Sequence, residues 1–511
     1  MTEYEIPELR IRQLNQQPER ADGTHVVYWM TASRRLHWNF SLQRAVSHSL
    51  RLGRPLIILE AVRCDYRWAS DRLHAFILQG MQENRHRASS YSNVLLHSYV
   101  EPASSHGSGL LQTLAERACV VVTDDFPCFF LPRMIRGAAA QMSVAVEAVD
   151  SNGLLPLQAT DQVFPTAYAF RRWLQKNLAP WLSNLPVADP LLALNQRQFP
   201  SFDANLLKRL NERWPEADEE LLEAKAAALQ RLPIDHSVGA GIQTGGTAAA
   251  ERQLSHFLSQ GLKRYGEERS QPDSDASSNL SGWLHFGHLS VHEIFARVAA
   301  IESWCPEQLA DAKETRGSRA GWWGMSSAAE SFLDELITWR EIGFNFCSHR
   351  RDYDQYSSLP NWAKTTLAEH AGDPRPTLYS LDELQAADTH DEIWNAAQTE
   401  LLRTGRMHNY LRMLWGKKIL EWSATPEAAL ECMIELNNRF AVDGRNPNSY
   451  SGIFWVLGRY DRAWGPERPI FGKIRYMSSD NTLRKLQMTD YLQKFGHSSP
   501  RRGRARQLFP E

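Results

Sequence analysis

A polar loop in front of an apolar helix start is one place where this sequence could do chemistry. Residues 267–281 read EERSQPDSDASSNLS, and the apolar stretch 282–287 follows them directly. Hydroxyl groups and free backbone N–H groups at a helix entrance either cap the helix or hold the oxygens of a phosphate. Capping is the simpler explanation for the loop alone, so phosphate binding needs support from elsewhere in the chain.

Acidic and aromatic residues at helical spacing form a second group. Glu335 and Trp339 are four residues apart, and Trp415 and Trp422 are seven apart, so each pair shares one face of a helix. Trp394 belongs to the preceding helix. An exposed carboxylate and buried core tryptophans would explain all five residues structurally. A carboxyl group in a dry pocket, however, has a raised pKa and can act as a proton donor.

The first 150 residues predict a sheet domain. Short runs of apolar, β-branched residues alternate with amphipathic stretches such as 73–84, which is the pattern of buried parallel strands joined by crossover helices. The expected strands are 25–30, 55–62, 94–100, 120–124 and 143–149. This is a doubly wound α/β domain, and without a GxGxxG motif after its first strand it has no ordinary dinucleotide site.

The rest of the chain predicts helices. An irregular connection with one helix at 219–229 leads into amphipathic segments, which are 328–337, 394–404, 407–422 and 426–440. We therefore expect three parts: the α/β domain at 1–160, a connector at 161–235 and an all-α domain at 236–511.

Charge and composition restrict the partners. The chain is 43% hydrophobic and 23% charged, with a net charge of −2, yet residues 391–511 carry 19 Lys/Arg against 13 Asp/Glu. A polyanion would therefore meet the C-terminal part, where the basic tail 500–506 would add nonspecific phosphate affinity. Six scattered cysteines predict neither disulfides nor a metal site. The start has no apolar secretory segment, and no run spans a membrane, so we expect a cytoplasmic protein.

The order of several sequence words resembles the photolyase/cryptochrome family. GGTAAAERQL (245–254), KRYGEER (263–269), SSNLSGWLHFGHLS (277–290) and RMHNYLRM (406–413) follow one another as they do in that family. The words at 330–347, 360–371, 389–422 and 468–477 resemble class II cyclobutane pyrimidine dimer (CPD) photolyases in particular. The resemblance implies an N-terminal Rossmann-like doubly wound parallel-sheet domain and an all-α C-terminal FAD-binding domain.

The same resemblance implies a FAD site. By position, the phosphates and ribityl chain would be held by Tyr265, Ser277, Ser278, Asn279 and Leu280. Asn409 and Arg412 would line the isoalloxazine ring, with Asp443 as the partner of the arginine. Asn437 would contact flavin N5, and Asn448 is the alternative. The active cofactor would be reduced, anionic FAD.

It also implies a lesion pocket and an electron-transfer chain. Glu335 would hydrogen bond the dimer, Trp339 and Trp455 would form two aromatic walls separated by a slot, and Met413 would form the floor. Trp394, Trp415 and Trp422 would carry an electron to oxidised flavin. Arg269 would contact the lesion phosphate, and further phosphate contacts would come from Arg439 and Arg462, together with Lys417, Lys418, Arg445, Arg459, Lys473 and Arg475.

The implied activity is light-driven repair of pyrimidine dimers in double-stranded DNA by a monomeric lyase without metal or nicotinamide. An antenna chromophore, a deazaflavin or a folate, would bind the N-terminal domain, although Trp38 stands where the family usually has an aspartate. The alternatives are a cryptochrome-like photoreceptor without repair and a (6-4) photolyase. The photoreceptor predicts a broken pocket, and the (6-4) enzyme predicts a pair of pocket histidines, of which only His408 is a candidate.

Overall fold

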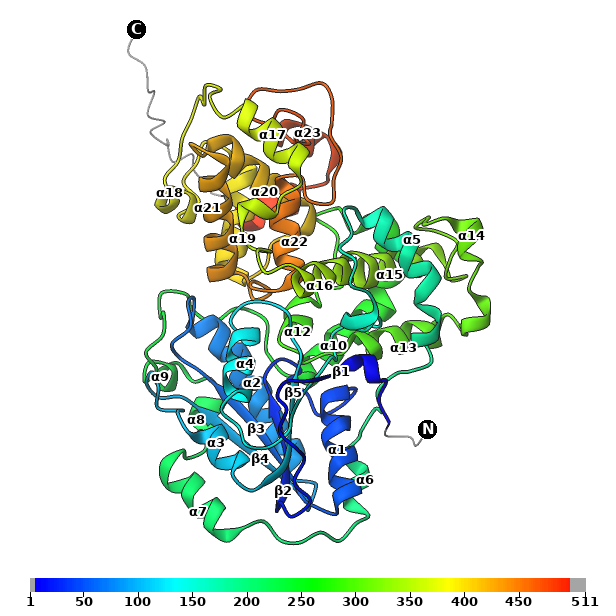
Figure 1. The fold of residues 1–511 in the computed structure, drawn as a ribbon. Helices are drawn as coiled ribbons and strands as arrows, with labels where there is room; N and C mark the ends of the chain where they lie inside the picture. The colour runs from blue at the N-terminus through cyan, green and yellow to red at the C-terminus, as the bar shows by residue number, and fades with distance from the viewer. Residues whose placement is uncertain (1–4, 497–511) are drawn as a thin grey trace. The chain divides into compact units, whose positions relative to one another are not determined.

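A computed structural model describes residues 5–496 (Figure 1), so the basic tail lies outside the described residues. The chain forms two compact units. The sheet unit contains Met1–Asp161, Lys176–Ser255 and Asn279–Leu309, and the helical unit contains Gln162–Gln175, His256–Ser278 and Ala310–Glu511. This division by compactness does not test the predicted domain boundaries, which stay predictions.

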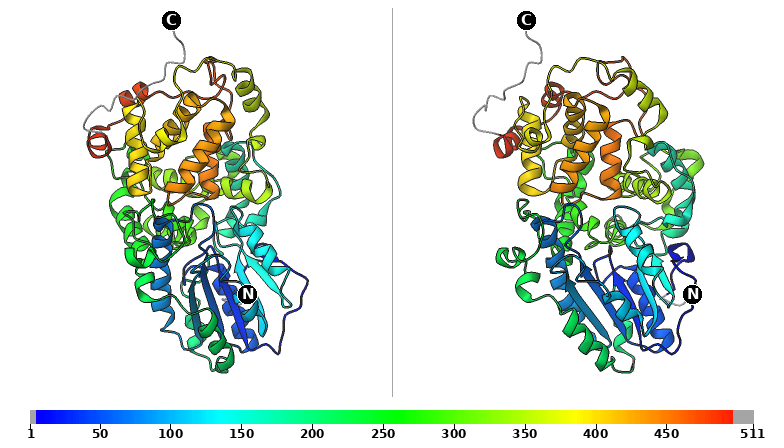
Figure 2. Two further views of the ribbon diagram at one scale, coloured as in Figure 1. Left: turned by 90° about the vertical axis from the view of Figure 1, so that its left-hand side faces the viewer. Right: turned by 60° about the vertical axis from the view of Figure 1, so that its left-hand side comes forward.

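The sheet unit contains six strands in the order β1-β6-β5-β2-β3-β4. Their bounds are β1 Ile11–Gln13, β2 His25–Met30, β3 Leu56–Val62, β4 Val94–Val100, β5 Ala118–Asp124 and β6 Val146–Val149. All neighbouring strands pair in parallel except β1, which runs antiparallel to β6 at the edge. The predicted doubly wound parallel sheet is therefore confirmed, and Figure 2 shows its strands side by side. The short strand β1 was not predicted.

The two faces of the sheet carry separate apolar cores because successive strand residues point to opposite sides. Val26 and Tyr28 of β2 pack with Phe40 of helix α1 (Phe40–Leu52) on one face. Val27 and Trp29 pack on the other face with helices α3 (Leu110–Ala115) and α4 (Leu131–Ala139). Helix α2 (Asp71–Ala88) packs against the ends of β3 and β4. Central strands that are buried on both faces explain their continuous apolar runs.

The sheet unit contains further helices. They are α6 (Leu192–Asn195), α7 (Ala204–Arg213), α8 (Glu219–Leu222), α9 (Ala226–Leu229), α10 (Thr247–His256), α12 (Ser281–His285) and α13 (Val291–Ile301). The single helix predicted at 219–229 is wrong. Ala224 takes a left-handed conformation with φ of 54°, which a continuous right-handed helix excludes, so the segment divides into α8 and α9.

The described part of the helical unit contains helices and no strand, as predicted for the C-terminal region. Its longer helices are α5 (Ala167–Asn177), α16 (Arg340–His349), α17 (Asn361–Glu369), α19 (Glu392–Thr404), α20 (Asn409–Trp422), α21 (Pro426–Phe440) and α22 (Pro447–Val456). The shorter ones are α11 (Tyr265–Glu268), α14 (Ala312–Thr315), α15 (Ser327–Leu333), α18 (Leu381–Gln385), α23 (Ser479–Lys485) and α24 (Thr489–Phe495).

Two glycines allow the central helices of this unit to approach one another closely. A Cβ at Gly343 of α16 would lie 3.0 Å from the carbonyl oxygen of Pro447, where α22 begins. A Cβ at Gly416 of α20 would lie 2.5 Å from Val456 of α22 and 3.0 Å from the sulfur of Met433 on α21. Helix α22 is therefore packed tightly against both α16 and α20.

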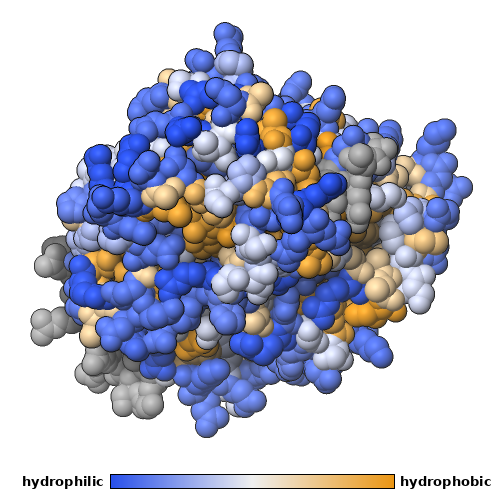
Figure 3. Space-filling model, turned by 90° about the horizontal axis from the view of Figure 1, so that it is seen from below, coloured by the Kyte–Doolittle hydropathy of each residue, from blue (hydrophilic) through white to orange (hydrophobic). Residues whose placement is uncertain are grey.

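Among residues 5–496, every helix is too short or too polar to cross a bilayer. One face of the molecule, drawn in Figure 3, is mostly hydrophilic with small separate hydrophobic patches.

Candidate functional site

A π-helical turn, Asp334–Trp339, positions the first two candidate residues between α15 and α16. The prediction of a regular α-helix at 328–337 is therefore wrong at this point. Such turns occur mostly as single interruptions of α-helices and frequently at functional sites. Asp334 anchors the turn inside the unit, because Arg171 of α5 donates to both carboxylate oxygens at 2.6 and 2.9 Å. Glu335 and Trp339 stay half-buried.

Glu335 lies in an ion pair that the sequence did not predict. A guanidinium nitrogen of Arg269 is 2.6 Å from Glu335 Oε1, and the same guanidinium lies 5.6 Å from the centre of the Tyr265 ring. Burial raises the pKa of Glu335 above its ordinary value, although Arg269 opposes this effect. Burial likewise raises the pKa of Tyr265. The structure therefore joins a predicted flavin residue, a predicted DNA contact and the predicted catalytic carboxyl in one cluster.

Trp339 and Trp455 stack directly on each other. Their ring centres are 4.5 Å apart and their planes are inclined by 19°, which is an offset-stacked contact. The predicted slot between two aromatic walls is therefore wrong, since stacked rings leave no room for a base between them. Both side chains are half-buried. Together they present an aromatic platform rather than two walls.

The residues predicted around the isoalloxazine lie at the start of α20 and beside α21. Arg412 donates to Asp443 at 3.3 Å, and both side chains are half-buried. Asn409 is exposed, and Met413 is half-buried one helical turn further along α20. This places one guanidinium and one carboxylate together beside the first turn of α20. Asn409 and Met413, which are four residues apart, share one face of that helix.

The two asparagines considered for flavin N5 differ in environment. Asn437 is buried on α21, and its amide nitrogen donates to Ser449 Oγ at 2.6 Å and to Asn438 Oδ1 at 3.2 Å. Asn448 is exposed in the first turn of α22. The position of Asn437 is thus fixed by its neighbours, whereas that of Asn448 is not fixed in the same way.

The predicted phosphate loop contains residues of both units, and each part is described separately. In the helical unit, Ser277 Oγ donates to the carbonyl oxygen of Arg269 at 3.4 Å, and Ser278 follows it. In the sheet unit, Asn279 has φ of 58° and its carbonyl accepts from Gln243, while Leu280 is buried. Leu280 is the N-cap of α12 and makes no side-chain cap bond, so capping by this residue does not explain the loop.

The three predicted electron-transfer tryptophans are neighbours. The Trp394 and Trp415 rings are 6.5 Å apart with planes inclined by 3°, and Trp394 and Trp422 are 5.5 Å apart. Asp391 caps α19 by accepting the N–H of Trp394 at 3.0 Å, which fixes the middle ring at the helix start. All three are buried, and Trp422 contacts the half-buried Tyr379 at 5.3 Å.

Several predicted phosphate contacts are wrong because their side chains are buried. Lys417, Lys418, Arg445 and Arg459 are each at most 9% exposed. Lys417 bonds the carbonyl oxygen of Val456, and burial lowers its pKa to about 7. Arg459 lies between the rings of Phe346 and Phe454.

Other basic residues of this group remain accessible. Arg462 and Arg475 are exposed and lie 4.8 and 5.3 Å from the centre of the Trp464 ring. Lys473 is exposed but pairs with Glu467 at 3.0 Å, and the half-buried Arg439 donates to Gln385 at 3.0 Å. Within this group, the accessible and unpaired positive charge is therefore that of Arg462 and Arg475.

His408 is a further site residue whose role the sequence left open. It lies directly before Asn409, its backbone N–H donates to Glu400 at 2.8 Å, and neither ring nitrogen makes a hydrogen bond within the described structure. Burial lowers the pKa of His408 to about 4, so its ring is neutral at pH 7. Its place in the word RMHNYLRM was the signal that could have identified it.

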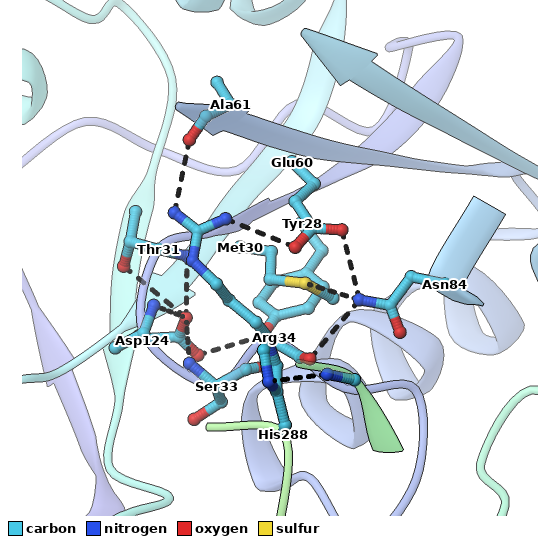
Figure 4. A network of polar contacts seen from close by, with 12 residues as sticks. Tyr28, Met30, Thr31, Ser33, Arg34, Glu60, Ala61, Asn84, Asp124 and His288 are labelled. Carbon is cyan, nitrogen blue, oxygen red and sulfur yellow. Dashed lines mark hydrogen bonds and ion pairs between the residues drawn. The ribbon is translucent and has the colours of Figure 1, made fainter. Parts of the chain in front are cut away.

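The sheet unit has a polar network of its own at the carboxyl ends of its central strands, which Figure 4 shows. Asp124, at the end of β5, accepts the N–H groups of Thr31, Ala32 and Ser33 at 2.8–3.0 Å. Arg34 pairs with the buried Glu60 of β3 at 3.2 Å. Ligands of doubly wound sheets bind where neighbouring strands lead away in opposite directions, and β2 lies at that point between β5 and β3. Here the chain's own charged side chains occupy that edge.

Comparison with known proteins gives long matches to one kind of enzyme. No protein-family model matches the chain. The deoxyribodipyrimidine photo-lyase of Methanothermobacter thermautotrophicus is 33% identical over 95% of this chain and 97% of its own length. That of Potorous tridactylus is 30% identical over 96% of this chain and 85% of its own. A class III photolyase from Agrobacterium tumefaciens has a similar fold, with a TM-score of 0.63 at 17% identity over 93% of this chain and 86% of that one.

Proposed function

We propose, on the premise that this chain belongs to the deoxyribodipyrimidine photolyase family, that it repairs cyclobutane pyrimidine dimers in DNA by a light-driven, FAD-dependent reaction of the class II type. The observation that carries the proposal is the half-buried Arg269–Glu335 ion pair in the same helical unit as the Trp339–Trp455 stack. The Arg269–Glu335 pair offers polar contacts for the edge of a pyrimidine, and the Trp339–Trp455 stack offers an aromatic face for the pyrimidine rings.

The residues of the helical unit fit a flavin. Arg412 and Asp443 form a half-buried ion pair, and a guanidinium in such a place favours an anionic ring beside it. The neutral ring of His408, with both nitrogens lacking a hydrogen bond among the described residues, offers an additional polar partner close to Asn409. Tyr265, Ser277 and Ser278 belong to the same unit. When bound and reduced, FAD would supply light-driven one-electron chemistry with no net redox change.

The aromatic platform binds the flipped dimer. Base stacking on an aromatic side chain contributes about 1–3 kcal/mol per base, which offsets an unstacking cost of a few kcal/mol. A dimer is poorly paired in its duplex and therefore costs less to flip than an intact pair of bases. Trp339 and Trp455 thus contribute to lesion selectivity through the difference in flipping cost.

Glu335 and Arg269 act on the polar edge of the dimer. A protonated Glu335 donates a hydrogen bond to a pyrimidine carbonyl, where negative charge develops once the electron has arrived. Arg269 positions the carboxyl group and, where it is released from Glu335, contacts a backbone phosphate of the lesion. Both residues hold the dimer while its two inter-base carbon–carbon bonds break.

We retain the remaining predictions as parts of this proposal. They are the class II assignment, action on double-stranded DNA as a monomer in the cytoplasm, an electron path through Trp422, Trp394 and Trp415, Asn437 at flavin N5, and an antenna of unspecified type. The alternative is a cryptochrome-like photoreceptor without repair. One measurement distinguishes the two functions.

That measurement is repair by purified protein. The chain is photoreduced, mixed with an oligonucleotide duplex that contains one thymine dimer, and illuminated, and restored thymines are counted by chromatography. We expect repair under light and none in the dark. A protein that carries FAD and photoreduces but restores no thymine is a photoreceptor, and the repair function is then wrong.

A further inference from the structure

His37 of the sheet unit is buried without a hydrogen bond. It lies in the loop between β2 and α1 and is 4% exposed. Neither Nδ1 nor Nε2 makes a hydrogen bond to any residue between 5 and 496. Leaving a buried polar group unsatisfied is energetically costly, so most such groups have a partner. The ring of His37 therefore has the capacity to bind a further partner besides the protein groups around it.

Two carboxylates face the same ring nitrogen. Glu293 Oε2 lies 3.3 Å from His37 Nε2, and Glu251 Oε1 lies 3.8 Å from it. Glu293 comes from α13 and Glu251 from α10, so three segments far apart in the sequence converge at one point of the sheet unit. Glu293 Oε2 is itself buried and makes no hydrogen bond within the described chain.

From this arrangement we infer that His37, Glu251 and Glu293 bind one divalent transition-metal ion of the zinc type. The three ligand atoms all lie within 4.8 Å of one another. Zinc binds imidazole nitrogen and carboxylate oxygen at about 2.0–2.2 Å, and tetrahedral angles then place two ligand atoms about 3.4 Å apart. The 3.3 Å separation is close to this value. The 3.8 Å separation, and that between the two carboxylates of at most 4.8 Å, would be brought to it by a movement of the Glu251 side chain.

Charge and access agree with a cation. A neutral imidazole and two carboxylates carry two negative charges, and although Arg297 lies 4.0 Å from Glu293, this ligand set still favours a cation. The Glu251 side chain is 45% exposed whereas those of His37 and Glu293 are 5% and 7% exposed, so an ion enters from the Glu251 side and keeps a water ligand there. Imidazole with carboxylate ligands suits zinc and its first-row neighbours better than calcium or magnesium.

The ligands are held by a second set of contacts. Arg35 fixes the His37 loop, because its guanidinium donates to the carbonyl oxygens of Trp38 at 3.0 Å and of Gly287 at 2.9 Å. Arg297 lies 4.0 Å from the other carboxylate oxygen of Glu293. Supporting contacts of this kind orient metal ligands. The ion would therefore cross-link the His37 loop, α10 and α13, and would have no part in the repair reaction.

The test is zinc binding to tag-free, full-length protein that has been dialysed against a chelator and then into buffer. Isothermal titration with Zn²⁺ should give one site per chain, and Co²⁺ should give the visible absorption of a low-coordinate site. Glu251→Gln changes the most exposed ligand and should keep the fold. We expect it to weaken zinc binding at least about 10- to 100-fold, the loss that even an outer-shell change produces.

Glu216→Gln is the matched control. Glu216 lies 3.6 Å from the buried His97, whose Nε2 already bonds the carbonyl oxygen of Trp214, so this histidine–glutamate pair needs no ion. The control should bind zinc like the unchanged protein, and zinc should raise the thermal unfolding midpoint of both but not of Glu251→Gln. If the unchanged chain takes up neither ion, or if Glu251→Gln binds zinc as Glu216→Gln does, the three residues form only an ion-pair cluster and the proposal is wrong.

Discussion

Two opposing effects act on the pKa of Glu335. Burial raises it, and the guanidinium of Arg269 at 2.6 Å lowers it, with burial the larger effect. The protonated form of Glu335 is therefore more populated than that of an ordinary glutamate, whose pKa is about 4.3. Repair that depends on this proton should decline as the pH rises through the raised pKa.

Replacement of Glu335 by glutamine should remove that pH dependence. Glutamine keeps a hydrogen-bond donor at every pH, so the repair quantum yield of Glu335→Gln should be flat where that of the unchanged enzyme declines. Glu335→Ala, which loses the donor, should repair less at every pH while retaining FAD. Loss of one hydrogen bond, about 1.4 kcal/mol, should also weaken dimer binding about tenfold.

The control for this pH profile is Glu268→Gln. Glu268 belongs to the same unit and pairs with Arg264 at 2.6 Å. Its variant should show the profile of the unchanged enzyme. Parallel profiles for Glu335→Gln and the unchanged enzyme would mean that Glu335 is ionised throughout and serves only to pair with Arg269.

Trp422 should affect activation and not repair. Trp394 lies between Trp422 and Trp415, so Trp422→Phe removes one end of the cluster and leaves the other two rings in contact. Photoreduction of oxidised flavin should be several-fold slower, while chemically reduced protein should repair dimers at the normal rate. Trp304→Phe, in the sheet unit, is the control. Equal rates of flavin absorbance change in the two variants would remove Trp422 from the path.

Residue-scale predictions from the sequence depended on spacing. The proximity of Trp394, Trp415 and Trp422 followed from helix periodicity and from the resemblance together. The contact between Arg269 and Glu335 was not predictable, because the two residues are 66 positions apart and only the tertiary fold brings them together. The stacking of Trp339 on Trp455 was missed for the same reason.

At the scale of elements, the packing of α22 should be sensitive to glycine substitution. Gly343→Ala would place a methyl group 2.6 Å from Ser451 Oγ and 3.0 Å from the carbonyl oxygen of Pro447, which is backbone and cannot rotate away. We expect a loss of about 1–3 kcal/mol in the free energy of unfolding, measured by urea titration. Trp339 directly precedes α16, and Trp455 lies within α22. The near-ultraviolet circular dichroism of these stacked rings should therefore change too.

Gly452→Ala, on α22 itself, is the matched variant. Nothing lies within 4 Å of a Cβ at that position, so alanine should leave stability unchanged or raise it by up to about 1 kcal/mol through better helix propensity. An equal loss in both variants would indicate that glycine is needed for backbone conformation and not for helix packing.

Elements differed in how well the sequence predicted them. The buried strands β2 to β5 were predicted within two residues because continuous Val/Ile/Leu runs occur only where both sheet faces are covered. Strand β1 has three residues, two of them polar, and forms only because β6 offers an unpaired edge. The break at Ala224 and the π-helical turn are responses to tertiary packing, which periodicity in the sequence does not record.

For the whole molecule, a count of basic residues does not show which of their charges DNA could reach. Four of the eight basic residues predicted to form a phosphate-binding face are buried, and Lys473 is paired. The sequence predicts the sign of the net charge of the C-terminal region, but it does not predict which of the charged side chains are accessible to solvent. DNA affinity should therefore depend on a small number of exposed arginines.

Arg462→Ala should weaken binding to dimer-free and dimer-containing duplexes alike. Loss of one phosphate contact should lower the slope of log affinity against log salt by about 1, measured by fluorescence anisotropy. Arg209→Ala is the control, because Arg209 is exposed in the sheet unit and already pairs with Glu116 at 2.9 Å. If both variants show the same slope as the unchanged protein, phosphate binding lies elsewhere.

The π-helical turn at Asp334–Trp339 makes the relative placement of Glu335 and the aromatic platform depend on one residue of the chain. Each residue of an α-helix advances the chain by about 100° around the helix axis. A relative with one residue fewer in this turn would continue as a regular α-helix, and its counterpart of Glu335 would face a different direction relative to Trp339 and α16. Two such proteins could be nearly identical in sequence and still present different surfaces to DNA. A one-residue gap in an alignment at this turn is therefore more informative about substrate than many substitutions around it.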